Sequence, residues 1–237
     1  MAYLVAPIMG TTVSIDVRDA AVPGAALETA VQTLRDLDAR FSTYREDSEI
    51  RQIERGELAV ADAHPDVREV LGACAVLRAE TGGAFDAWRG GGLDPSGYVK
   101  GWAIEEAAWQ IDAAGGRNYC INAGGDVVAA GPAWRVGIRH PLDAHAVAAI
   151  VEAEDLAVAT SALYERSGHV LTPSGRPPEG VLSVTVTGPD LGIADAYATA
   201  ALAMGSDGPA WTLRLDGYEA MTILADERVL TTPGFPA

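Results

Sequence analysis

The sequence predicts an α+β fold, with mixed sheets packed against helices in one compact unit of two lobes that spans residues 1–237. Three observations lead to this prediction. Short strand-like segments occur in runs among amphipathic helical segments, instead of alternating as regular strand–helix–strand units. No internal repeat and no long linker divides the chain. Hydrophobic residues make up 49% of the 237 residues, which is enough to bury a core.

The N-terminal third is expected to contain a strand region followed by three helices. Residues 3–17 partly alternate and are rich in Val, Ile and Thr, which predicts a strand pair or one long strand. Apolar residues at helical spacing predict helices over residues 24–40, from Asp47 or Ser48 onward, and over residues 65–81. Pro65 opens the last of these helices, and Gly82-Gly83 ends it.

A glycine-rich stretch at residues 82–97 is expected to be a loop, and loops on rigid scaffolds tend to carry functional side chains. Beyond it, helices are predicted at residues 98–114, 192–204 and 207–215. Strands are predicted near residues 118–121, 126–130, 134–139, 147–151, 156–160 and 181–187, with a hairpin near 218–230. A tight turn at Gly124-Gly125-Asp126 joins the first two of these strands.

The charge of the chain limits the ligands that it can bind unaided. Lys and Arg number 17 and Asp and Glu number 33, which gives a formal net charge of −16. The sequence contains no basic stripe, which argues against a nucleic-acid surface. A dinucleotide would therefore need a metal ion, a helix N-terminus or one well-placed cation beside its phosphates.

Targeting and cysteine signals are few. The N-terminus shows no basic segment, no long apolar segment and no cysteine placed for lipidation, so the chain as given is expected to be cytoplasmic, with export from a longer precursor left open. No stretch approaches 18 apolar residues, so no membrane span is expected. Cys74 and Cys120 lie in apolar segments, which favours two buried thiols over a disulfide.

Asp195 and Thr199 form the first candidate site. Their spacing of four residues puts both side chains on one face of a predicted helix. Both carry hard oxygen donors, which magnesium prefers. The structural alternative is an aspartate near a helix start and a threonine bonded to its own helix.

The second candidate is the segment LDPSGYVKGWA, in which Asp94 and Lys100 flank a turn that opens a helix. Backbone N–H groups at a helix start, together with one lysine, suit a phosphate group. The Gly97 carbonyl can offer an oxygen to a cation. The spacing of a P-loop is absent, and a solvated helix cap is the alternative.

Three further signals are weaker. His169 lies between turn signals beside a short apolar strand, where it can act as general base for a hydroxyl group or serve only a structural role. Tyr44, Phe85 and Trp88 offer flat rings that can stack on a flavin or adenine, or simply pack. The paired glycines of INAGGDV allow a sharp turn or a close approach of the backbone to a ligand.

Taken in order, several segments resemble the ApbE-like FAD:protein FMN transferases. They are MGT at 9–11, FSTYREDSEI at 41–50, GGAFD at 82–86, LDPSGYVKGWA at 93–103, INAGGDV at 121–127, WRVGIRHP at 134–141, ATSALYER at 159–166, GHVLTPSG at 168–175 and IADAYATAALAMG at 193–205. Each motif is short, but their shared order over nearly the whole chain is specific. The resemblance implies an ApbE-like fold and an enzyme that moves FMN from FAD to a threonine or serine hydroxyl of an acceptor protein and releases AMP.

The resemblance also implies roles for individual residues. Asp195, Thr199 and the Gly97 carbonyl resemble the family's ligands for Mg²⁺, and His169 resembles its catalytic base. The positions that match FAD contacts in the family are Met9, Tyr44, Ala84, Phe85, Asp86, Asp94 and Lys100, with Val170 or Leu171 on the flavin side.

One loop departs from the family pattern. Only seven residues, Ala87 to Leu93, separate Asp86 from Asp94. The family has a longer stretch there, so part of the wall of the FAD pocket is expected to be missing. Two other functions remain open: hydrolysis of FAD to FMN and AMP by the same site, and binding of FAD without catalysis.

Overall fold

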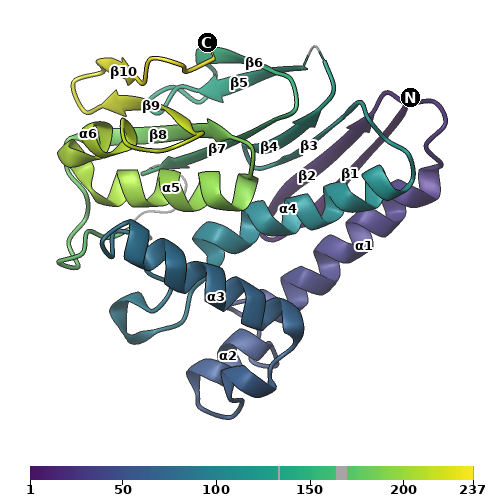
Figure 1. Cartoon of the computed structure of the whole chain (residues 1–237), viewed down its shortest axis with the longest axis horizontal. Helices are drawn as coiled ribbons and strands as arrows, with labels where there is room; N and C mark the ends of the chain where they lie inside the picture. Colours follow the sequence, from purple (N-terminus) through teal and green to yellow (C-terminus); the bar gives the residue numbers. More distant parts are fainter. Residues whose placement is uncertain (133, 164–169, 237) are drawn as a thin grey trace.

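The structure is a computed structural model, and it describes residues 1–132, 134–163 and 170–236. Its strands are β1 (Ala2–Ile8), β2 (Thr11–Val17), β3 (Tyr119–Ala123), β4 (Asp126–Ala130), β5 (Trp134–Arg139), β6 (Val147–Ala153), β7 (Leu156–Ala162), β8 (Val181–Gly188), β9 (Glu219–Leu224) and β10 (Val229–Thr231). Eight of them form one large sheet in the order β1-β2-β3-β4-β7-β8-β9-β10, and β5 and β6 form a small sheet (Figure 1). The pairings between these strands are antiparallel.

The helices are α1 (Gly24–Phe41), α2 (Glu49–Glu54), α3 (Pro65–Glu80), α4 (Ser96–Ala113), α5 (Leu191–Ala203) and α6 (Gly208–Thr212). Figure 1 shows α1, α4 and α5 following one another across one face of the large sheet, with α2 and α3 farther from it. Single 3₁₀ turns occur at Val60–Asp62, Arg89–Gly91 and Gly205–Asp207. Helices packed on one face of an antiparallel sheet make this an α+β fold, as the sequence predicts.

Two hydrophobic cores hold these layers together. On the helix side, alternate residues of β2 such as Val13 and Ile15 pack with helical residues such as Leu34. On the other face, the small sheet contributes Ile138 and its neighbours to a second core that includes Val158 of β7. The central strands are therefore covered on both sides, and each fully buried aliphatic side chain contributes about 1.5–3 kcal/mol to the free energy of unfolding.

The N-terminal segment forms a strand pair, which decides between the two predictions made for it. β1 pairs with β2 over its whole length, and the two-residue turn between them is Met9-Gly10. Both turn residues have positive φ, 53° at Met9 and 70° at Gly10, as expected for a tight hairpin turn. The Met9 N–H donates to Asp38 Oδ2 at 3.2 Å, which ties the turn to α1.

The remaining predicted elements are also present, with boundaries shifted by a few residues and one correction. The helix predicted over residues 207–215 is shorter, because a 3₁₀ turn precedes it and α6 ends at Thr212. Thr212 Oγ1 donates to the Pro209 carbonyl at 3.0 Å, a local bond that competes with continuation of the helix.

Neither cysteine forms a disulfide. Cys74 is a buried free thiol, and Cys120 is a free thiol that is only partly buried. Burial raises the pKa of Cys74 to about 12 and that of Cys120 to about 11.

Within the described ranges, no helix has the length and apolar character to cross a lipid bilayer.

Helices α4 and α5, which carry predicted site residues, cross in close contact. A Cβ atom at Gly101 of α4 would lie 2.4 Å from the Leu191 carbonyl oxygen, so only glycine permits this crossing. The contact brings Glu105 of α4 to the first turn of α5, where Glu105 Oε1 accepts a hydrogen bond from the Leu191 N–H at 2.6 Å. Glu105 thus adds a hydrogen bond between the two helices at the first turn of α5.

The stability of this crossing is expected to depend on pH. Burial, and next the Asp190 carboxylate, raise the pKa of Glu105 from 4.5 to about 7. The folded protein therefore binds a proton at Glu105 more tightly than the unfolded chain does. The contribution of protonated Glu105 to the free energy of unfolding is complete below about pH 4.5 and is lost as pH rises through about 7. The loss amounts to up to about 3 kcal/mol.

Glu105→Gln is expected to remove this pH dependence, because the amide cannot ionise. Urea unfolding at about pH 5 and about pH 8 measures it. The wild-type protein should lose stability relative to Glu105→Gln at the higher pH. Equal changes in both proteins would contradict a buried, proton-binding Glu105.

Candidate functional site

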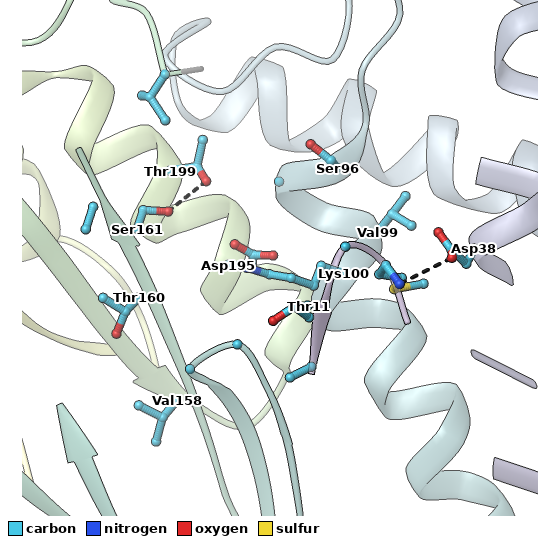
Figure 2. Close-up of a pocket in the computed structure, with 18 of the residues that line it drawn as sticks. Thr11, Asp38, Ser96, Val99, Lys100, Val158, Thr160, Ser161, Asp195 and Thr199 are labelled. Atoms are coloured by element: carbon cyan, nitrogen blue, oxygen red, sulfur yellow. Dashed lines mark hydrogen bonds between the residues drawn. The ribbon is translucent and has the colours of Figure 1, made fainter. Parts of the chain in front are cut away.

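A cavity of about 770 Å³ lies beside the place where the pairing of β4 with β7 ends. β4 pairs with β7 as far as Val127 opposite Val158, and β7 then continues to Ala162 beside the cavity. The β1–β2 turn, the β3–β4 turn and the first turn of α4 line the cavity, and α5 faces them (Figure 2). Segments from distant parts of the sequence therefore meet at one place.

The predicted turn at Gly124-Gly125 forms part of this cavity wall. Both glycines have positive φ, 66° and 109°, and they join β3 to β4. A Cβ atom at Gly124 would lie 2.5 Å from Thr11 Oγ1 on the neighbouring hairpin. The turn therefore needs glycine both for its conformation and for its close approach to β2.

A cluster of oxygen atoms lies between α4, α5 and β7. Asp195 and Thr199 both face the cavity from α5, and Asp195 is only 2% exposed. Thr199 Oγ1 lies 3.0 Å from Ser161 Oγ of β7, and the bond is visible in Figure 2. A Cβ atom at Gly97 would lie 3.1 Å from Thr199 Oγ1, so the α4 backbone reaches the same cluster. The structure thus brings together the three residues predicted to bind a metal.

The chemistry of this cluster restricts the cation that it suits. Among the described residues, no group of three or more His, Cys, Asp or Glu side chains is placed to hold a metal ion. One carboxylate with hydroxyl and backbone oxygens is too weak a set for a dedicated protein cage. It matches the way Mg²⁺ is held, with few carboxylates and the remaining positions filled by water and substrate phosphates.

Lys100 also lines the cavity, one helical turn after Gly97. Its ammonium nitrogen forms an ion pair with Asp126 Oδ2 at 2.5 Å. Asp126 is 1% exposed, and its other oxygen, Oδ1, accepts a hydrogen bond from the Thr160 N–H at 3.0 Å. This aspartate was not among the residues predicted from the sequence.

A second, smaller cavity of about 150 Å³ adjoins the first. Gly97, Thr199 and Val170 line both cavities, so two members of the oxygen cluster lie at the junction, and Asp195 lines the larger cavity alone. The other predicted residues that line the smaller cavity are Ala84, Phe85, Asp86, Asp94 and Leu171.

The two acidic residues of the smaller cavity already have partners. Asp86 Oδ2 pairs with Arg78 Nε at 3.0 Å, and Asp86 Oδ1 accepts from the Trp88 N–H at 3.0 Å. Asp94 Oδ1 accepts from the Ser96 N–H at 3.0 Å and so caps the turn that opens α4. Both carboxylates therefore shape the loop, in addition to facing the cavity.

The shortened loop contains an arginine that ties two walls of the smaller cavity together. Arg89 donates to the Thr172 carbonyl at 2.7 Å and to the Ala84 carbonyl at 2.8 Å, and it also bonds to the Gly83 carbonyl. These acceptors come from segments more than 80 residues apart. Arg89 thus joins the shortened loop to the segment at Thr172.

The aromatic candidates have different positions. Tyr44 lines the larger cavity with its side chain 78% exposed, so its ring is available for stacking. Phe85 is 4% exposed and packs in the helix-side core, and it also lines the smaller cavity, so its contact with FAD stays a prediction. Met9 lines the larger cavity from the β1–β2 turn.

The remaining predicted site residues lie at the edge of what the structure describes. Val170 and Leu171 are described and line the cavities as stated above. His169, the predicted catalytic base, lies outside the described residues. Its role stays a prediction from the sequence.

Sequence reasoning missed three polar residues of the site: Asp126, Ser161 and Asp38. A charged residue directly after Gly124-Gly125 and before an apolar strand was a visible signal for Asp126. Ser161 lies within the family-like segment ATSALYER but was given no role, and Asp38 carries no local signal, because its place beside the cavity depends on which segments the fold brings together.

A model of the ApbE family matches residues 9–91 and 88–222 of this chain. The two matches meet inside the shortened loop, where the sequence departs from the family pattern. The FAD:protein FMN transferase of Rhodobacter capsulatus is 33% identical over 61% of this chain but only 32% of its own length. The FAD:protein FMN transferase of Vibrio cholerae is 28% identical over 86% of this chain and 82% of its own length.

Solved structures confirm the fold. The flavin transferase ApbE from Vibrio cholerae superposes with a TM-score of 0.85 and 24% identity, covering 99% of this chain and 97% of the other. The ApbE protein of Thermotoga maritima superposes with a TM-score of 0.90 and 23% identity, covering 100% of this chain and 99% of the other.

Proposed function

Since the chain belongs to the ApbE family, we propose that it is an Mg²⁺-dependent FAD:protein FMN transferase. It would move FMN from FAD to the hydroxyl group of a threonine or serine in an acceptor protein and release AMP. The observation that carries the proposal is that Gly97 and Thr199 lie at the junction of two cavities, while Asp195 of the same helix as Thr199 faces the larger cavity. A dinucleotide with its diphosphate at that junction would have a cavity for each half.

Asp195, Thr199 and the Gly97 carbonyl would hold the magnesium ion. When bound, the ion supplies positive charge that neutralises the phosphoryl oxygens of FAD. The donor set supports this assignment, because it contains hard oxygens and only one carboxylate, which leaves room for phosphate oxygens. The first turn of α4 and Lys100 add positive potential at the same place.

The chain's own groups would then position the reactants and move one proton. His169 would accept the proton of the acceptor hydroxyl, and that oxygen would form a bond to the phosphorus on the riboflavin side. The bridging P–O bond breaks, and AMP leaves with the bridging oxygen. Tyr44 would cover the flavin at the rim, and Met9 would contact it from the β1–β2 turn.

The proposal also concerns the whole chain as one functional unit over residues 1–237. Together the two cavities draw on segments from Met9 to Thr199, so no smaller part of the chain would carry the whole site. FAD and an acceptor protein would be its partners.

A transfer assay tests this function against its alternatives. The protein is mixed with FAD, Mg²⁺ and peptides that carry a threonine or serine, and the products are separated by mass. FMN attached to a peptide, together with AMP, is the expected result. Release of free FMN and AMP alone would indicate hydrolysis, and unchanged FAD with measurable binding would indicate a flavin-binding protein.

A further inference from the structure

Lys100, which lines the larger cavity together with Arg139, forms an ion pair with the buried Asp126. We propose that Asp126 is a positioning residue, which fixes the Lys100 ammonium against the sheet so that it can meet a phosphate of the nucleotide. The proposal rests on the proposed function in one respect, that the nucleotide is FAD. Asp126 itself would not touch the substrate, because it lies beneath Lys100 and is 1% exposed.

The position of Asp126 in the sheet explains why a carboxylate belongs there. The paired residues of β4 and β7 end at Val127 opposite Val158, next to the cavity. Beyond that pair, the Thr160 N–H of β7 donates to Asp126 Oδ1 instead of to a main-chain carbonyl of β4. The aspartate side chain thus replaces a strand partner at the point where the sheet opens.

The second carboxylate oxygen connects the sheet to α4. Asp126 Oδ2 lies 2.5 Å from Lys100 Nζ, and the Lys100 side chain is 27% exposed, so its charged end is held between the buried aspartate and the cavity. A carboxylate as buried as Asp126 requires both a hydrogen bond and an opposite charge. Oδ1 accepts the hydrogen bond from β7, and Oδ2 pairs with the opposite charge from α4.

A lysine side chain needs a neighbouring group to fix its position more than an arginine side chain would. Lys100 is the only lysine of the sequence, and the other 16 of its 17 basic residues are arginines. The ammonium is a compact charge on a flexible four-carbon stem, whose rotamer freedom is lost when it binds a ligand. If Asp126 fixes the stem beforehand, that loss does not weaken nucleotide binding.

A double-mutant cycle on FAD binding tests the proposal. FAD affinity is measured by quenching of flavin fluorescence in EDTA, for wild type, Asp126→Asn, Lys100→Met and the double variant. Each single change is expected to weaken FAD binding about 10- to 100-fold, the size of a lost charge-assisted contact. The double variant should bind as Lys100→Met does, because Asp126 acts through Lys100.

Three results would overturn the proposal. In the first, the Asp126→Asn variant binds FAD as tightly as wild type. In the second, it binds FAD more tightly, as expected if the carboxylate only repelled phosphate. In the third, the Asp126→Asn substitution weakens FAD binding by the same factor in proteins with and without Lys100. A wild-type protein that does not bind FAD at all would instead contradict the proposed function. Asp155→Asn is the matched control: Asp155 Oδ1 accepts from the Gly131 N–H at 2.8 Å near the other end of β4, and FAD affinity should not change.

A stability measurement covers the case in which Asp126→Asn does not fold. Lys100→Met leaves a buried carboxylate without its opposite charge, so the double variant should melt at a higher temperature than Lys100→Met. A double variant that melts at the same or a lower temperature would show that the two groups are not coupled.

Discussion

Replacing Asp195 by alanine is expected to lower kcat/KM for FAD by about 10³-fold and to remove the dependence of the rate on Mg²⁺. Asp195 is the only carboxylate in the proposed ligand set, and the chain's net charge of −16 provides no general excess of positive charge for an anionic dinucleotide. Without it, a hydroxyl and a carbonyl oxygen remain, and neither carries charge to retain the ion. Initial rates measured against Mg²⁺ concentration give the result.

Asp190→Asn is the control for this prediction. Asp190 lies at the start of the same helix and caps it, with Oδ1 accepting from the Ile193 N–H at 2.7 Å. Asparagine caps helices about as well as aspartate, so this variant should keep its Mg²⁺ dependence. An Asp195→Ala protein with wild-type rate and wild-type Mg²⁺ dependence would exclude the proposed metal site.

Replacing His169 by alanine is expected to slow transfer to the acceptor by about 10²–10⁴-fold, the usual contribution of a general base. FAD binding should change little, because the proposed role of His169 concerns the acceptor hydroxyl and not the dinucleotide. Single-turnover transfer to a peptide, measured alongside FAD affinity, separates these two quantities.

His145→Ala controls for the loss of a histidine elsewhere. His145 lies in the loop between β5 and β6, where its backbone N–H donates to Asp143 Oδ1 at 2.9 Å. This variant should transfer FMN at the wild-type rate. If His169→Ala also transfers at that rate, histidine has no part in the proton transfer.

The fold could be predicted in large part because its elements follow simple periodicities. The helix over residues 24–40 and the helix opened by Pro65 were expected from apolar spacing and from end signals, and both are confirmed. α6 is shorter than predicted, because a local bond of Thr212 competes with the helix and no periodic signal records it. The order of strands in the large sheet could not be predicted, since pairing depends on contacts between distant segments.

The candidate site was predictable where its residues lie close in sequence. Asp195 and Thr199 share a helix face, and their meeting in one cavity follows from a spacing of four. The ion pair of Lys100 with Asp126 and the contact of Thr199 with Ser161 join residues 26 and 38 positions apart. Such contacts arise from strand register and helix packing, which the local pattern does not determine.

A crystal of the protein grown with FAD and Mn²⁺ in place of Mg²⁺ tests the metal site most directly. We expect an anomalous peak at the junction of the two cavities, within coordination distance of Asp195, Thr199 Oγ1 and the Gly97 carbonyl, beside the diphosphate of FAD. A metal peak bound by other residues, or FAD bound with its diphosphate away from α5, would contradict the account.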